Sequence, residues 1–279
     1  MTAAPVVLKY GGELVEDPAH LRTAVSSIVA AIDRSIPLVV VHGGGREVDM
    51  ALKASGIEKR QVDGLRITDE ATLGVVVSVL AGVVNTRVVA ALVTSGVPAV
   101  GLTGVDGGCG LSRRAAAHHT VDGRTVDLGY VGVPVDHADT AALQALIDRR
   151  FVPVVASIGV DGEGRLLNVN ADTFAGHLAA RLRARRLVIA GTTAGVLSED
   201  GATIPVLEAS AIGSLFTSGT ANAGMIAKLR ACEHAIAGGV HDAVIVDGRD
   251  AAEIESAVSG SVPRRATRVM AAVALSPRP

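Results

Sequence analysis

Lysine is scarce in this chain, and two of its lysines stand where a phosphate group would need them. Lys9 ends an apolar run and precedes a pair of glycines, and Lys228 lies shortly after another glycine. A compact ammonium group beside bare backbone N–H groups suits a phosphoryl group in transfer. The chain has 22 arginines and four lysines, which are Lys9, Lys53, Lys59 and Lys228. We interpret Lys9 and Lys228 as candidate catalytic residues, and Lys53 and Lys59 as surface residues.

Two glycine runs, at 11–12 and 43–45, each follow an apolar segment of strand type. Ligands of open α/β sheets bind beyond the carboxyl ends of the strands, and glycine lets backbone N–H groups approach an anion there. No Gly-Lys pair occurs, so neither run is a P-loop, and neither completes a dinucleotide fingerprint, which argues against a Rossmann dehydrogenase. Together the two runs favour a backbone site for an anion.

Two further polar residues allow both a structural and a functional interpretation. Asp172 opens a predicted helix, where Asn170 would be the N-cap and the carboxylate would face the positive end of the helix dipole. The same carboxylate could hold two lysines in position, and beside them it would stay ionised and organise the site without acting as a base. Arg66 precedes another predicted helix and is either a solvated cation or a two-pronged donor to a carboxylate.

The elements that must position these residues alternate along the chain. Apolar runs predict strands and amphipathic periodicity predicts helices, which together indicate a mainly parallel sheet covered on both faces. A polar stretch at 111–135, with a turn signal at Asp122-Gly123, predicts a β-hairpin excursion. The strands are expected at 5–9, 38–41, 97–102, 152–155, 186–189 and 243–246, and the helices at 18–33, 46–55, 69–95, 137–149, 171–184 and 222–237.

Composition excludes several classes of protein. A formal charge of −2 and an aromatic content of 2% argue against a nucleic-acid partner. Two cysteines cannot form a disulfide framework, so we expect a reduced, cytoplasmic setting. The N-terminus lacks the pattern of a signal peptide, and we expect no apolar stretch long enough to span a membrane.

Five motifs occur in one order and at a spacing that together resemble the amino acid kinase family, and within it the N-acetylglutamate kinases. The resemblance extends from about residue 5 to Arg268. The motifs are Lys9-Tyr10-Gly11-Gly12, His42-Gly43-Gly44-Gly45, Gly64-Leu65-Arg66-Ile67-Thr68, Asn168-Val169-Asn170-Ala171-Asp172 and Gly224-Met225-Ile226-Ala227-Lys228.

The resemblance implies a single amino acid kinase domain over residues 1–279, folded as an open three-layer αβα sandwich. It implies an N-terminal lobe at about 1–175 for the acyl amino acid and a C-terminal lobe at about 176–279 for the nucleotide. The implied reaction transfers the γ-phosphoryl group of ATP to the side-chain carboxylate of N-acetyl-L-glutamate, as in arginine biosynthesis. Mg²⁺ would be bound through the nucleotide phosphates, with no metal ion held by protein side chains.

The same resemblance assigns roles to individual residues. Lys9 and Lys228 would neutralise charge on the phosphoryl group, and Asp172 would hold both lysines. The phosphate-binding backbone would be that of Gly11, Gly12, Gly44 and Gly45, whose N–H groups would bind phosphoryl oxygens. The implied substrate-binding residues are Gly44, Gly45, Arg66 and Asn168, and the implied nucleotide-binding residues are Thr192, Gly195, Met225 and Lys228.

Departures from the family pattern keep alternatives open. Thr192 stands where the family usually has an aspartate at the nucleotide edge, and Val105 replaces a common lysine. A kinase of another acylated acidic amino acid, such as carrier-linked aminoadipate, would use the same lysines and could use the basic stretch at 113–119. A non-catalytic sensor on the same fold is the third possibility. Because the chain starts at its first strand, without the additional helix of ring-forming members, we expect a homodimer that lacks their feedback.

Overall fold

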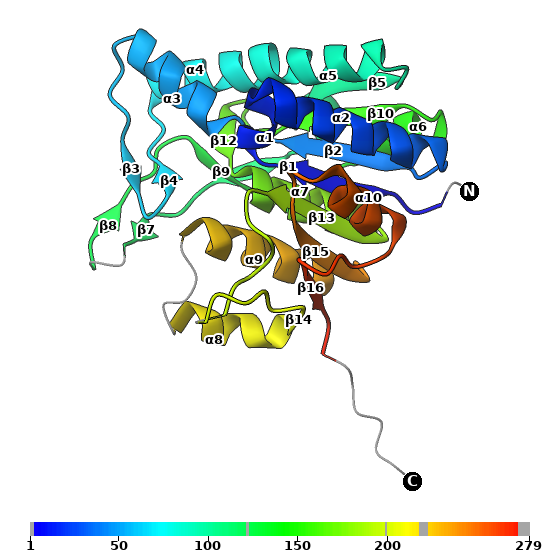
Figure 1. Ribbon diagram of the computed structural model, residues 1–279. Coiled ribbons are helices and arrows are strands. Elements are labelled where there is room, and N and C mark those ends of the chain that lie inside the picture. Colours follow the sequence, from blue (N-terminus) through cyan, green and yellow to red (C-terminus); the bar gives the residue numbers. More distant parts are fainter. Residues whose placement is uncertain (1–2, 121–122, 199, 218–222, 273–279) are drawn as a thin grey trace.

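The molecule is built on an eight-stranded sheet (Figure 1). The computed structural model describes residues 3–120, 123–198, 200–217 and 223–272. Every pairing in this sheet is parallel except that of β15 with β16. All the apolar runs expected to form strands lie in it, so the mainly parallel sheet is confirmed. In order across the sheet the strands are β14 (Val206–Glu208), β16 (Thr267–Met270), β15 (Asp242–Asp247), β13 (Arg186–Gly191), β1 (Val6–Tyr10), β2 (Leu38–His42), β10 (Val152–Ala156) and β5 (Ala99–Thr103).

Helices pack on both faces of the sheet and complete the three layers. Successive side chains of a strand point to opposite faces, so Leu8 of β1 packs in one apolar cluster and Val7 in the other. The first cluster includes side chains of α1 (Gly12–Glu16), α2 (Pro18–Asp33), α3 (Gly45–Ala54), α4 (Glu70–Val77), α5 (Asn85–Thr94) and α10 (Ala251–Ser259). The second includes side chains of α6 (Ala141–Asp148), α7 (Ala171–Arg181), α8 (Ile212–Thr217) and α9 (Ala223–Ala237). The helix expected at 222–237 corresponds to α9. Its described part begins at Ala223, since residue 222 lies outside the described residues.

One continuous helix corrects an expectation drawn from the sequence. It runs through α4, the π-helical segment η1 (Ser78–Val84) and α5. Its 25 residues have a mean hydropathy of 2.0 over their most apolar window, so by length and composition it could cross a membrane. The expectation that no apolar stretch reaches that length is wrong, although core helices of soluble proteins pass the same test. Val76, Leu80 and Val88 of this helix pack in the apolar cluster beside the sheet.

Short strands outside the main sheet build the region at 111–135 and its surroundings. The expected hairpin is formed by β7 (His118–His119) and β8 (Thr125–Val126), and Asp122 of its turn lies outside the described residues. A second hairpin, β3 (Gln61–Val62) with β4 (Leu65–Arg66), carries Arg66. A four-stranded sheet comprises β11 (Ile158–Val160), β12 (Leu166–Val169), β9 (Val131–Pro134) and β6 (Ser112–Arg114), and single 3₁₀ turns lie at η2 (Asp106–Gly108) and η3 (Ala209–Ala211).

The main sheet continues through both halves of the chain. β1 from the N-terminal half pairs with β13 from the C-terminal half over its whole length. The expected division at about residue 175 falls inside α7. The assignment of separate ligands to the two lobes stays a prediction.

Candidate active site

Lys9 and Lys228 meet at one carboxylate, that of Asp172. The Lys9 Nζ lies 2.8 Å from Asp172 Oδ1, and the Lys228 Nζ lies 3.3 Å from Oδ2. The Lys9 contact is a close ion pair between two buried side chains. The three side chains come from β1, α7 and α9. Residues far apart in the sequence are thus joined at the carboxyl end of the sheet. Lys228, for example, lies 56 positions after Asp172.

Local structure explains how Asp172 reaches this position. Asn170 caps α7, and its Oδ1 accepts the N–H groups of Asp172 at 2.9 Å and Thr173 at 3.0 Å. The capping prediction for Asn170 is therefore confirmed. Asp172 lies in the first turn of the helix, where the helix dipole favours a negative charge.

Burial and charge act against each other in this cluster. Burial works to raise the pKa of Asp172, but the charges of Lys9 and Lys228 outweigh it and hold that pKa below its ordinary value. Burial also lowers the pKa of Lys9, with a smaller contribution from Lys228, against the opposing pull of Asp172. Asp172 is therefore a carboxylate and not a general base at neutral pH. Two ammonium groups and one carboxylate leave a net charge of +1, which suits an anionic ligand.

The two glycine runs come into contact beside this cluster. A Cβ atom on Gly12 would lie 3.0 Å from both the Cα and the nitrogen of Gly44, so the backbones approach as only glycine allows. A Cβ on Gly44 would lie 2.8 Å from Leu80 in the π-helical segment, which presses against this turn. Gly45 is the first residue of α3, where the initial N–H groups of a helix lack intrahelical partners.

Gly11 does not fit its predicted role. Its N–H donates a 2.9 Å hydrogen bond to the carbonyl of Ala190 and so extends the sheet pairing of β1. That donor is not available to a phosphoryl oxygen. The anion-binding prediction is consequently narrowed to the backbone of Gly12, Gly44 and Gly45.

A cavity of about 200 Å³ brings most of the predicted residues together. A second cavity of about 330 Å³ adjoins it and shares Gly45, Arg66, Asn168 and Asn170 with it. Ser157, which the sequence analysis did not assign to the site, also lines the first cavity. The predicted residues that line the first cavity are Lys9, Gly12, Gly44, Gly45, Arg66, Asn168 and Asp172.

Arg66 lines this cavity and carries a donor nitrogen that has no partner among the described residues. One of its guanidinium nitrogens, Nη2, contacts Asp49 and lies 3.3 Å from the carbonyl of Gly45. The other, Nη1, is buried and has no hydrogen-bond partner among the described residues. Nearby, Asn168 donates a 3.1 Å hydrogen bond to Thr68, which leaves its second amide hydrogen available. These groups can bind a carboxylate and an amide.

Sequence reasoning missed the residues that hold Arg66 and the second glycine run. Lys59, interpreted as a surface residue, lines the larger cavity and lies 2.7 Å from Asp49, the partner of Arg66. His42 is fully buried and contacts Asn85 at 3.0 Å through Nε2. Burial lowers the pKa of His42 to about 4, so this histidine is neutral at pH 7. The histidine before the glycines was visible in the motif, but nothing in the sequence indicated its partner.

The residues predicted to bind the nucleotide do not line the two cavities described above. The Lys228 side chain packs over Gly191, the last residue of β13. Thr192 is exposed and its hydroxyl lies 3.4 Å from Glu13. A Cβ on Gly195 would lie 2.5 Å from the hydroxyl of Thr267, so Gly195 is needed for packing there. Met225 is partly buried on α9. Their contact with a nucleotide stays a prediction.

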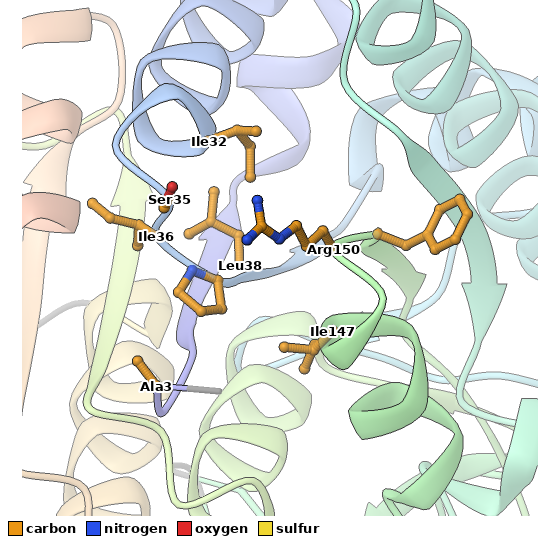
Figure 2. Close-up of a pocket in the computed structure, with 9 residues that line it drawn as sticks. Ala3, Ile32, Ser35, Ile36, Leu38, Ile147 and Arg150 are labelled. Atoms are coloured by element: carbon orange, nitrogen blue, oxygen red, sulfur yellow. The ribbon is translucent and has the colours of Figure 1, made fainter. Parts of the chain in front are cut away.

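An apolar cavity of about 210 Å³ lies elsewhere and plays no part in this site. Figure 2 shows Ile32, Leu38 and Ile147 around it, with the Arg150 side chain extending among them. Leu38 is the first residue of β2, whereas the glycine run follows the end of the same strand. This cavity is therefore at the amino ends of the strands, away from the lysines.

Comparison with known proteins decides the family. Residues 4–247 match the family model described as "Amino acid kinase family". The chain belongs to the amino acid kinase family. The matched region includes the glycine runs and all three members of the lysine–aspartate cluster.

Proteins similar to this chain include an acetylglutamate kinase and an N-acetylglutamate synthase. The chain is 40% identical over 252 residues to the acetylglutamate kinase of Novosphingobium aromaticivorans, an alignment that covers 87% of this chain and 83% of that protein. Its structure is similar to that of N-acetylglutamate synthase from Neisseria gonorrhoeae complexed with coenzyme A and N-acetyl-glutamate. The TM-score is 0.79 and the identity 27%, over 96% of this chain and 59% of the synthase chain.

A more distant member of the comparison supports the fold alone. Carbamate kinase from Giardia lamblia bound to AMP-PNP has a TM-score of 0.67 and 15% identity, over 97% of this chain and 100% of that chain. The αβα fold expected from the sequence is thus confirmed. The family is one of phosphotransferases, which agrees with a cationic cavity able to bind an anion.

Proposed function

We propose that this chain transfers the γ-phosphoryl group of ATP to the side-chain carboxylate of N-acetyl-L-glutamate. The observation that carries the proposal is that Lys9 and Lys228 meet at Asp172, and that Lys9, Asp172 and Arg66 line one cavity. The similarity to an acetylglutamate kinase supports this choice of substrate. The enzyme would supply an acyl phosphate to arginine biosynthesis.

The reaction needs charge stabilisation and alignment more than proton transfer. A carboxylate oxygen of the substrate forms a bond to the γ-phosphorus while the bond to the β-bridging oxygen breaks, and ADP leaves with that electron pair. The nucleophile is already ionised, so no base is required. Lys9 and Lys228 stabilise negative charge on the phosphoryl oxygens and the leaving oxygen, and Asp172 keeps the two ammonium groups apart and in place.

Substrate recognition follows from the groups left free. The buried Nη1 of Arg66 suits the α-carboxylate of the amino acid, since a guanidinium binds a carboxylate in a fixed plane. The second amide hydrogen of Asn168 suits a neighbouring carbonyl. The backbone of Gly44 and Gly45 would face both the substrate and the phosphoryl group.

Mg²⁺ fits this site only as a companion of the nucleotide. Asp172 is the only acidic residue among those that line the smaller cavity, and its oxygens already contact two lysines. When bound through the nucleotide phosphates, Mg²⁺ supplies additional neutralisation of their charge. Thr192, Gly195 and Met225 are the proposed nucleotide contacts.

A kinase of a carrier-linked substrate is the second candidate, and the basic stretch that motivated it is partly occupied. Arg114 pairs with Asp127 at 2.9 Å, and His118 contacts Asp63 at 2.8 Å. Both side chains thus have partners within the chain. A non-catalytic sensor would not require two lysines on one carboxylate, so we rank it third.

We further propose a cytoplasmic homodimer that does not bind nucleic acid or enter a membrane. Both cysteines, Cys109 and Cys232, are free and buried, as a reducing setting favours. Val83 and Val93 on the long helix are about half exposed, and a second copy would remove such apolar area from water. Light scattering of the purified chain checks this: a monomer at micromolar concentration contradicts the dimer.

A coupled assay of ADP release tests the function. N-acetyl-L-glutamate, free glutamate and N-acetyl-aminoadipate are compared at equal enzyme and Mg-ATP. We expect the highest kcat/KM for N-acetyl-L-glutamate. A higher value for the aminoadipate derivative favours the second candidate, and binding of ATP without turnover of any acid favours the sensor.

A further inference from the structure

A cluster of metal-ligating side chains lies outside the candidate active site. The ligand-capable atoms of Asp136, His177 and His234 all lie within 4.8 Å of one another. Asp136 is in the turn after β9, His177 is on α7 and His234 is on α9. The two imidazole rings are stacked, with centroids 6.2 Å apart. Three separate segments of the chain thus converge on one small volume.

His177 carries an unexplained buried nitrogen. The residue is only 2% exposed, and its Nε2 has no hydrogen-bond partner among the described residues. A buried polar atom left without a partner typically costs about 1–3 kcal/mol. Asp136 and His234 are exposed beside His177, so the buried imidazole has two further potential ligands next to it at the surface.

We propose that Asp136, His177 and His234 bind one divalent transition-metal ion of the Zn²⁺ type. Two imidazole nitrogens and a carboxylate oxygen form a donor set that such ions prefer, and Mg²⁺ and Ca²⁺ favour oxygen ligands instead. The ion gives the buried imidazole of His177 a polar partner. Three protein ligands leave a fourth tetrahedral position for water.

The geometry needs only small side-chain rotations. Metal–nitrogen distances of about 2.0–2.1 Å place tetrahedral ligands roughly 3.3 Å apart. The ligand atoms therefore have to close by up to about 1.5 Å from their 4.8 Å limit. His177 is fixed in the interior, whereas exposed Asp136 and His234 can turn toward it.

Arg181 is a cation close to this cluster, and the ion must tolerate it. Arg181 lies one helical turn after His177, and its Nε donates a 3.1 Å hydrogen bond to the carbonyl of Ala138. Burial, and then His234 and Arg181, lower the pKa of His177 to about 4, against a smaller effect of Asp136.

The ion would fasten together the two helices that carry the catalytic cluster. His177 follows Asp172 on α7, and His234 follows Lys228 on α9. The helices touch between these points, because a Cβ on Gly176 would lie 2.6 Å from the carbonyl of Ala231. The proposed ion is a structural link beyond that contact, takes no part in phosphoryl transfer and does not depend on the proposed substrate.

Titration of the tag-free, metal-stripped full chain with Zn²⁺ tests the site. We expect one ion per chain by calorimetry, visible absorption bands of tetrahedral Co²⁺ when Co²⁺ is used instead, and a melting temperature raised by roughly 5 °C at saturating Zn²⁺. Asp136→Asn and His234→Gln should each weaken Zn²⁺ binding at least about tenfold and abolish the thermal shift.

His137→Gln is the matched control, since His137 is exposed and adjacent to Asp136. It should bind Zn²⁺ as the wild type does. Asp136→Asn and His234→Gln change only exposed side chains, so the test does not depend on whether a His177 variant folds. The absence of saturable binding in the wild type, unchanged affinity in those two variants, or an equal loss in His137→Gln would each overturn the proposal.

Discussion

Two buried aspartates, Asp172 and Asp242, occupy opposite ends of the parallel sheet and hold different cations. Asp242 is the first residue of β15 and pairs in register with Arg186, the first residue of β13. Asp172 lies at the other end, beside Lys9, the next-to-last residue of β1. Both carboxyl groups have a pKa held below the ordinary value by neighbouring cations that outweigh the effect of burial.

In the network at Asp242, every guanidinium nitrogen of Arg186 donates a hydrogen bond. Arg186 donates to both carboxylate oxygens at 2.7 and 2.6 Å, and Arg268 adds a third bond at 2.7 Å. The remaining nitrogen of Arg186 donates to the carbonyls of Ala257 and Ser261, each at 2.7 Å. A planar guanidinium suits such an arrangement of several acceptors around one side chain.

The network at Asp172 leaves capacity unused. Its two partners are lysines, each with three donor hydrogens, and the cluster opens on a cavity lined by glycine backbone. Arginine thus joins strands where stability is needed, and lysine is placed where a charged group in transfer must be met. The contrast indicates that the first network acts on folding and the second on turnover.

Loss of the carboxylate at Asp242 should give the largest effect on stability. Asp242→Asn leaves the buried charge of Arg186 without its counter-charge, so we expect the free energy of unfolding to fall by about 3–5 kcal/mol. Chemical denaturation measures it. Turnover per folded molecule should stay near the wild-type value, and a loss of turnover in fully folded protein would break the comparison.

Loss of either lysine should act in the opposite way. Lys9→Ala and Lys228→Ala should each lower kcat by about a hundred- to a thousandfold with a smaller change in KM, because a pre-organised charge is lost mainly from the transition state. Steady-state kinetics measures this. Unfolding of Lys228→Ala should stay close to wild type, since Asp172 keeps Lys9. Lys53→Ala, at an exposed lysine, is the control that should leave kcat unchanged.

A conservative exchange sharpens the distinction between the two cations. Lys228→Arg keeps the charge but replaces a compact ammonium with a larger planar group, so we expect kcat to fall by about a hundredfold through misplacement. The same coupled assay measures it. Recovery of full turnover by Lys228→Arg would mean that charge alone matters at this position.

Acid should weaken the Asp242 network, with a smaller effect on stability than loss of its carboxylate. The folded-state pKa of Asp242 is depressed, so its stabilisation is complete above the unfolded-state value of about 3.9 and is lost as pH falls through the folded-state pKa. Unfolding of the wild type should therefore depend more steeply on pH below about 4 than that of Asp242→Asn. Denaturation midpoints over a pH series measure the slopes, and parallel curves contradict the assignment.

Much of the site could be predicted because its parts are local in sequence. The glycine runs follow buried strands, and the carboxyl ends of parallel strands share one edge, so Gly12 and Gly44 had to lie close together. Asn170, a residue type favoured at the N-cap, indicates the start of the helix that carries Asp172. Gly11 was wrongly assigned because the sequence does not show where the sheet pairing ends, and its N–H serves that pairing.

Other features depend on tertiary contacts that no local pattern encodes. Lys59 seemed a plain surface residue because Asp49, which joins it to Arg66, lies on another element. The long helix at 69–95 was expected, but its π-helical segment, which presses Leu80 onto Gly44, was not. His177 and His234 sit on helix faces with no motif between them, so their approach follows only from the packing of α7 on α9.

In the proposed reaction, two lysines on one carboxylate promote the transfer of a phosphoryl group from ATP to a carboxylate substrate, which forms an acyl phosphate. Trapping with hydroxylamine tests it most directly, since an acyl phosphate reacts to give a coloured iron–hydroxamate complex. With Mg-ATP and N-acetyl-L-glutamate, the wild type should form hydroxamate in step with ADP, and Lys228→Ala should form about a hundredfold less or lower still. Absence of hydroxamate from folded wild type, or equal formation by Lys228→Ala, would contradict the claim.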